Sequence, residues 1–174
     1  MPTVMVNSAH TRVPHLQRRC YSIIHTEFLT TQPGICKVGE VVLGGICLGL
    51  TITYGTPVWL LLGPAYGFFL TTASATFLGA AVTLLSYLLS SHTFRAARTT
   101  ILETVQNSVA SMLYTGSSIF LLIRTYFILW PLYLVTPYFQ AYPAMMAVSV
   151  FGLVAALVHA IDAVCAHRAF KQRR

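Results

Sequence analysis

Four long apolar stretches, separated by short polar or turn-forming segments, constrain this chain more than any other feature. They occupy residues 34–54, 65–89, 104–129 and 140–163. A helix needs about 20 apolar residues to cross a bilayer, and each stretch reaches that length. Only 9% of the 174 residues are charged, whereas soluble domains carry about 25%. The sequence therefore predicts an all-α integral membrane protein, a four-helix bundle with no second folded domain.

The basic residues indicate how such a bundle is oriented. With one exception they fall in alternate gaps between the stretches: Arg12, Arg18, Arg19, Lys37, Arg95, Arg98, Arg168, Lys171, Arg173 and Arg174. The other two gaps, 55–64 and 131–139, carry no charge. Because basic residues favour the cytoplasmic side, we expect both termini to be cytoplasmic. The predicted organisation is a cytoplasmic arm (1–32), a four-span domain (33–166) and a basic cytoplasmic tail (167–174).

Aromatic and basic residues mark the predicted outer interface. Both tryptophans, Trp59 and Trp130, lie at outer ends of the spans, where amphipathic rings are favoured. Arg124 breaks the basic alternation, since it lies near the outer end of the third span. It is either an interfacial anchor stacked on Tyr126 or Trp130, or a cation that binds a lipid headgroup or a partner's carboxylate.

The acidic residues gather at the opposite, predicted inner face. Glu40, Glu103 and Asp162 approach one depth there, together with Lys37 and His159. The spacing of Glu103 from Thr100 matches a capping box at a helix start. Lys37 and Glu40 form either an i,i+3 pair that snorkels to the cytoplasmic surface, or part of a polar cluster that joins Glu40 and Asp162 to His159.

Small residues recur at four-residue spacing and predict close helix packing. They are Gly45 and Gly49 in the first span, Gly63, Gly67, Ala75 and Gly79 in or beside the second, and Gly152, Ala156 and Ala160 in the fourth. The rows suit either packing within the bundle or association with a second copy or another membrane protein.

Cysteines and the tail suggest contacts with the inner leaflet. Cys20, Cys36 and Cys165 lie at or near the predicted cytoplasmic face, and their position alone makes them candidates for palmitoylation. The tail, with Arg168 and Lys171, suits attraction to anionic inner-leaflet lipids. The net charge of +7 therefore indicates a membrane surface rather than nucleic acid. The histidines lack paired metal-ligand spacing, and we expect no catalytic site, metal or cofactor.

The start of the first span carries a family resemblance. Its pattern Gly-Ile-x-Lys-x-x-Glu-x-x-Leu-Gly, formed by Gly34, Ile35, Lys37, Glu40, Leu43 and Gly44, resembles the MARVEL-domain family, which includes MAL, plasmolipin and the chemokine-like-factor transmembrane proteins. The whole layout of four spans with short connections is also similar. The resemblance implies work in vesicle trafficking, membrane apposition or tight junctions and, in some invertebrate members, cell–cell fusion of myoblasts.

The sequence favours a non-enzymatic membrane organiser at the plasma membrane or on trafficking vesicles. Its partners would be the lipid bilayer and other membrane proteins. A four-span junction or adhesion protein is the first alternative, although both predicted outer loops are short and lack the cysteines of claudins and tetraspanins. A transporter or channel is more remote, because the outer halves of the spans offer no polar path.

Overall fold

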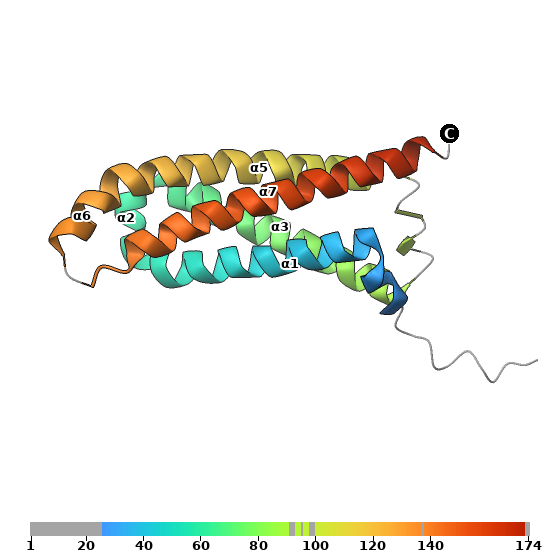
Figure 1. Cartoon of the computed structure of the whole chain (residues 1–174), viewed down its shortest axis with the longest axis horizontal. Helices are drawn as coiled ribbons and strands as arrows, with labels where there is room; N and C mark the ends of the chain where they lie inside the picture. Colours follow the sequence, from blue (N-terminus) through green and yellow to red (C-terminus); the bar gives the residue numbers. More distant parts are fainter. Residues whose placement is uncertain (1–25, 91–92, 95, 98–99, 137, 173–174) are drawn as a thin grey trace, which may run out of the picture.

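The computed structural model describes residues 26–90, 93–94, 96–97, 100–136 and 138–172. Within them, four helical segments are long and apolar enough to cross a membrane: Gln32–Leu62, Pro64–Leu89, Leu102–Val135 and Ala141–Lys171. They lie lengthwise in one elongated bundle (Figure 1). The predicted all-α four-helix architecture is confirmed.

Two of these segments change helix type before a proline. The first segment comprises α1 (Gln32–Leu50), the π-helix η3 (Thr51–Gly55), the 3-10 helix η4 (Thr56–Val58) and α2 (Trp59–Leu62). The third comprises α5 (Leu102–Arg124), the π-helix η5 (Thr125–Leu129) and α6 (Trp130–Val135). A proline has no N–H and its ring clashes with the carbonyl four residues earlier. Those carbonyls, of Thr53 before Pro57 and of Phe127 before Pro131, fall inside the π turns. The wide turn accommodates the proline, so each helix continues instead of ending.

The helices consequently run further than the sequence predicted. The first was expected to end at residue 54 and the third at residue 129, but they continue to Leu62 and Val135. The fourth span was expected to end at residue 163, and α7 (Ala141–Lys171) continues well into the predicted tail. Much of what was expected to be outer loop or tail is therefore helical.

A single glycine makes the tight connection between the first two spans. Gly63 has a φ of 59° and stands between α2 and α3 (Pro64–Leu89). That left-handed conformation is readily adopted only by glycine. Pro64 then opens α3, where a proline is favoured because the first helical N–H has no partner. This turn folds α3 back along α1.

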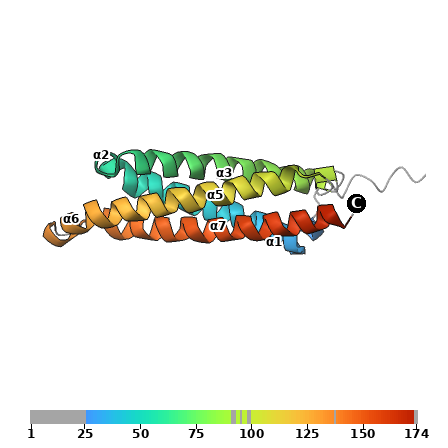
Figure 2. The same ribbon diagram turned by 90° about the horizontal axis from the view of Figure 1, so that it is seen from above.

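The long helices form a ring. Each packs against two neighbours in the order α1, α3, α5, α7 and back to α1, with the most extensive contact between α5 and α7 and the least extensive between α3 and α5. Figures 1 and 2 show α2 and α6 at one end and the C-terminus at the other. The end near α2 and α6 has an apolar core that includes Leu62, Phe69, Leu121, Leu129 and Met145. We call the other end the tail end.

The predicted small-residue rows pack the bundle only in part. A Cβ on Gly45 would lie 3.5 Å from Phe77, and one on Gly152 would lie 2.8 Å from Phe69. Gly79 faces Gln106 of α5, Ala156 is buried, and Ala160 is half-buried.

The prediction of packing within the bundle is wrong for three other members of these rows. Gly49, Gly67 and Ala75 are exposed, and a Cβ on either glycine would meet nothing within 4 Å. Gly63 serves the turn rather than a helix face. Four-residue spacing finds a helix face but does not say whether it turns inward or towards lipid.

Candidate functional site

A buried lysine near the start of α1 is the centre of the most polar part of the bundle. Thr31 caps α1: its Oγ1 accepts a hydrogen bond from the Gly34 amide at 3.3 Å and donates one to the Phe28 carbonyl at 2.6 Å. The Phe28 backbone occupies the space that a Cβ of Gly34 would need. This start directs Lys37, one turn later, into the bundle, where it is only 1% exposed.

The ammonium group of Lys37 contacts acceptors on its own helix and on two others. Its Nζ lies 2.8 Å from Glu40 Oε2 on α1, 2.9 Å from Asp162 Oδ2 on α7 and 3.1 Å from Asn107 Oδ1 on α5. Glu103 Oε1, also on α5, is 3.9 Å away. The ammonium group therefore ties α1 to both α5 and α7.

Asn107 connects Lys37 to Asp162 and was not identified from the sequence. Its Nδ2 donates to Asp162 Oδ2 at 2.7 Å, while its Oδ1 accepts from Lys37. The sequence did contain a signal for Asn107, because Glu103, Asn107 and Tyr114 follow the spacing of one helix face and all three are buried. A polar residue in a stripe that otherwise faces the core must find its partners there.

His159 completes the polar cluster, which we define as Lys37, Glu40, Glu103, Asn107, His159 and Asp162. The His159 ring stacks on Tyr114 with centroids 5.8 Å apart and an interplanar angle of 23°. Its Nδ1 lies 3.2 Å from Asn107 Oδ1 and 3.2 Å from Glu40 Oε1. Hydrogen-bond geometry is met only with Asn107.

The structure thus brings together all five residues predicted for the inner face, but two local interpretations of them are wrong. The Lys37–Glu40 pair does not snorkel to a surface, since its side chains are 1% and 0% exposed. Thr100 and Glu103 form no capping box: the Thr100 hydroxyl donates to the Ala97 carbonyl at 2.8 Å, and α5 begins with no side-chain cap. Tertiary contact with Lys37 takes Glu103 inward instead.

The distance along α7 from the cluster to the aromatic residues near α6 matches the thickness of a bilayer's hydrocarbon core. Asp162 follows Tyr142 by about 20 residues, which is about 30 Å of helix at 1.5 Å per residue. That length equals the thickness of a bilayer's hydrocarbon core. Tyr142 packs on Trp130 with ring centroids 5.3 Å apart, as expected for an aromatic belt at the opposite boundary.

The cluster brings three carboxylates to one lysine and one imidazole. Breaking such a buried network by removing one partner is strongly destabilising. The arrangement can lock the register of three helices and can accept hydrogen bonds, whereas no group of three or more His, Cys, Asp or Glu residues in the described chain could hold a metal ion.

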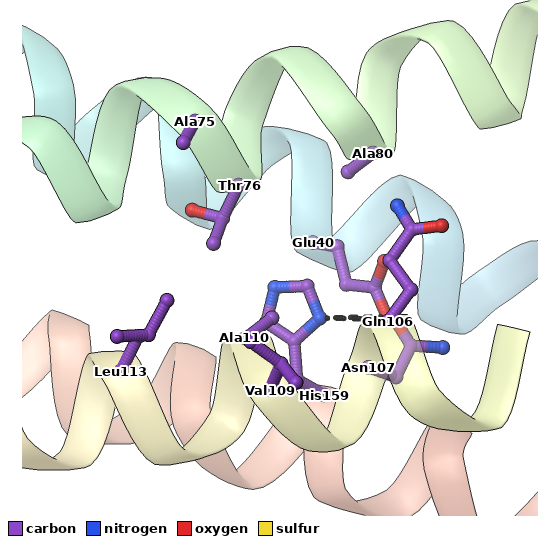
Figure 3. A pocket seen from close by; sticks show the side chains of 10 residues that line it. All are labelled: Glu40, Ala75, Thr76, Ala80, Gln106, Asn107, Val109, Ala110, Leu113 and His159. Atoms are coloured by element: carbon purple, nitrogen blue, oxygen red, sulfur yellow. Dashed lines mark hydrogen bonds and ion pairs between the residues drawn. The ribbon is translucent and has the colours of Figure 1, made fainter. Parts of the chain in front are cut away.

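A cavity of about 310 Å³ opens beside the cluster, between α3 and α5 (Figure 3). Glu40, Gln106, Asn107 and His159 line one part of it. Figure 3 shows Ala75 and Leu113 at the other end, away from Gln106 and Asn107. The cavity therefore has a polar end and an apolar end.

The residues predicted for the outer interface lie at the end of the bundle near α2 and α6. Trp59 and Trp130 are 52% and 38% exposed. Arg124 is half-buried, and Trp130 packs on Tyr133 and Tyr142. The Nη2 of Arg124 lies 3.4 Å from the position of a Cβ on Gly63, so its guanidinium reaches the α2–α3 turn.

The predicted acylation sites are only partly visible. Cys36 and Cys165 are half-buried and form no disulfide in the described chain, and Gln32 Nε2 lies 3.4 Å from Cys165 Sγ. Cys20 lies outside the described residues, as do Arg173 and Arg174 of the tail.

Comparison with known proteins agrees with this architecture. The profile of the MARVEL family, described as a membrane-associating domain, matches residues 28–165. Protein singles bar of Drosophila melanogaster is 35% identical over 156 residues, which cover 90% of this chain and 89% of that protein. No solved structure gives a significant match. Because the profile covers three of the long helices and most of α7, and a relative aligns along nearly its whole length, the chain belongs to the MARVEL family of membrane-associating proteins.

Proposed function

We propose that this protein is a non-enzymatic membrane organiser that gathers lipid and partner proteins for vesicle trafficking or cell–cell fusion. The proposal rests on the location of the folded residues. Nearly all described residues belong to four membrane-length helices, and the connections between them are short. A protein built in this way acts through its bilayer-facing surface rather than through a domain in water.

The interior of the bundle argues against the transport alternative. Beyond the polar cluster, towards α2 and α6, the centre contains Phe69, Leu121 and Met145, each 0% exposed. The buried polar side chains there, which include Thr51, Ser117, Ser118, Thr125 and Ser149, carry only hydroxyl groups. Those of Thr51 and Ser149 donate to carbonyls one turn earlier and need not line a path. A transport route needs polar groups through the whole depth of the membrane. The cluster is therefore better explained as a lock between helices than as one end of a pore.

The exposed small residues support association with other transmembrane helices. Gly49 on α1 and Gly67 and Ala75 on α3 face outward, where a second helix could approach closely. A second copy of the chain or another membrane protein would pack there. Replacement of Gly67 by Leu should reduce co-purification of differently tagged copies, whereas replacement of the exposed Leu78 by Ile should not.

The central experiment is proximity labelling by the tagged full-length chain in its native cells, with its location determined in parallel. A control fuses the same labelling enzyme to an unrelated four-span protein in the same membrane. Enrichment of coat and sorting proteins would favour trafficking, and enrichment of fusion-site and actin-nucleating proteins would favour fusion. A labelling pattern identical to that of the control would contradict the organiser proposal.

A reconstitution experiment separates the organiser from a transporter. Purified protein in liposomes should give no ion flux above that of empty liposomes. A flux that disappears in Glu40→Gln would overturn the proposal, because it would make the cluster part of a conduction path.

A further inference from the structure

Arg124 carries a positive charge at the end of the bundle near α2 and α6. It lies in the last turn of α5, is half-buried, and reaches the turn at Gly63 with its Nη2. Its Nε is buried and donates no hydrogen bond within the described residues. A guanidinium stays protonated in proteins, and an uncompensated charge in a membrane is costly. The group therefore needs an acceptor that carries negative charge.

The acidic side chains of the sequence lie at the tail end instead. There are four of them: Glu40, Glu103 and Asp162 belong to the polar cluster, and Glu27 lies in the 3-10 helix η2 (Thr26–Thr30), which packs against the start of α1. The C-terminus lies at that end too (Figure 1). Arg124 follows Asn107 of the cluster by about 17 residues of α5, which is about 25 Å of helix. The negative charge that pairs with Arg124 must therefore come from outside the chain.

The start of α3 adds positive potential beside the guanidinium. α3 begins at Pro64, directly after Gly63, and no side chain caps it. A helix N-terminus has a partial positive charge and unpaired amides, which favour an anion. An arginine fork binds a phosphate through two parallel hydrogen bonds. The helix start and the guanidinium thus favour the same kind of ligand.

The surface around Arg124 matches the two parts of a phospholipid. Phe120 lies one turn deeper on the same face of α5, and Phe68 lies deeper than Gly63 on α3; both rings are exposed. Trp59 and Trp130 are exposed at the same end, as is typical of the headgroup level. A phospholipid presents a phosphodiester at that level and acyl chains below it. A partner's carboxylate would first have to be brought there, whereas phosphodiesters surround the protein in a phospholipid bilayer.

We propose that Arg124, together with the adjacent start of α3, binds the phosphodiester of a membrane phospholipid whose acyl chains lie along Phe68 and Phe120. The site requires only the four-span fold. It does not rest on a role in trafficking or fusion, so either proposal can fail without the other.

The test uses the two tryptophans of the chain as reporters, because both lie at this end. Full-length protein in maltoside micelles is titrated with phosphatidylcholine whose acyl chains carry bromine atoms, which quench tryptophan fluorescence on contact. The matched lipid is a glucosyl diacylglycerol with the same brominated chains and no phosphate. Neither lipid has a net charge, so the net charge of +7 on the protein attracts neither. We expect phosphatidylcholine to reach half-maximal quenching at about a tenfold lower mole fraction, as one charge-assisted hydrogen bond allows.

Three variants assign the preference to Arg124. Arg124→Met should bring the two lipids to the same midpoint. Lys171→Met removes one charge from the last turn of α7 and should leave the preference unchanged. Arg124→Lys should keep part of the preference, because an ammonium group retains the charge but not the fork. Each variant is first compared with the parent protein by size-exclusion chromatography.

Several results would overturn the proposal. Equal midpoints for the two lipids in the parent protein would exclude the phosphodiester, and a preference that persists in Arg124→Met or disappears in Lys171→Met would exclude Arg124 as its source. Reversal of the quenching by inorganic phosphate would make a free anion the occupant, and stronger quenching by a brominated fatty acid would favour a carboxylate. Should Arg124→Met not remain monodisperse, an unreduced preference in Arg124→Lys would contradict the guanidinium contact.

Discussion

Removal of the buried ammonium group of Lys37 tests the polar cluster most directly. In Lys37→Met the chain keeps a side chain of similar length but loses contacts of 2.8 Å to Glu40, 2.9 Å to Asp162 and 3.1 Å to Asn107. The carboxylates then remain buried with no lysine beside them. Breaking a buried ion pair in this way is destabilising by about 3–5 kcal/mol.

The magnitude translates into a measurable thermal shift. For a chain of this size a change of 1 kcal/mol moves the midpoint of unfolding by about 2–4 °C. Lys37→Met should therefore lower the apparent Tm by about 6–20 °C. The assay is thermal unfolding of the protein in detergent, followed by loss of the monodisperse peak in size-exclusion chromatography.

The chain supplies its own control, because its other lysine is on the surface. Lys171 is exposed in the last turn of α7, and Lys171→Met should change stability by less than about 0.5 kcal/mol. Glu40→Gln should be milder than Lys37→Met, since Lys37 keeps its contact with Asp162. Equal Tm values for the two lysine variants, or a larger loss in Glu40→Gln, would refute the description of the cluster as a lysine-centred lock.

Two further predictions concern packing and orientation. Gly152→Ala should destabilise the protein by about 1–3 kcal/mol, because its Cβ would clash with Ser118 Oγ and would lie 2.8 Å from Phe69. Gly49→Ala should be neutral or stabilising by up to about 1 kcal/mol. Thermal unfolding compares the two variants, and equal losses would contradict the assignment of inward and outward faces. In a background without cysteines, a cysteine at Tyr138 should react with a membrane-impermeant maleimide on intact cells, and one at Arg168 only after permeabilisation. The reverse pattern would contradict the predicted path through the membrane.

The spans and their class could be predicted from the sequence because they depend on properties of single segments. Length and apolarity identify a membrane helix without reference to its neighbours, and the described part of the chain contains four such helices. The ends were harder to place. The predicted first and third spans ended at residues 54 and 129, but the π turns at Thr51–Gly55 and Thr125–Leu129 let the helices continue through Pro57 and Pro131.

The members of the polar cluster were largely recognisable, since charged residues are rare in membrane helices and must find partners. Their geometry was not. A carboxylate near a helix start can cap its own helix or turn inward, and only the position of Lys37 on another helix decides this for Glu103. Asn107 was missed for the same reason, because its role comes from contacts to residues 52 to 70 positions away.

What the sequence determined by itself is therefore the number, class and approximate extent of the membrane helices, since local composition controls their insertion in lipid. The tertiary structure alone decided which face of each helix meets another. It buried Gly152 and left Gly49 exposed, and it drew Lys37 into the bundle rather than to the surface. Packing between helices depends on contacts distant in the chain, and those contacts also leave the cavity between α3 and α5.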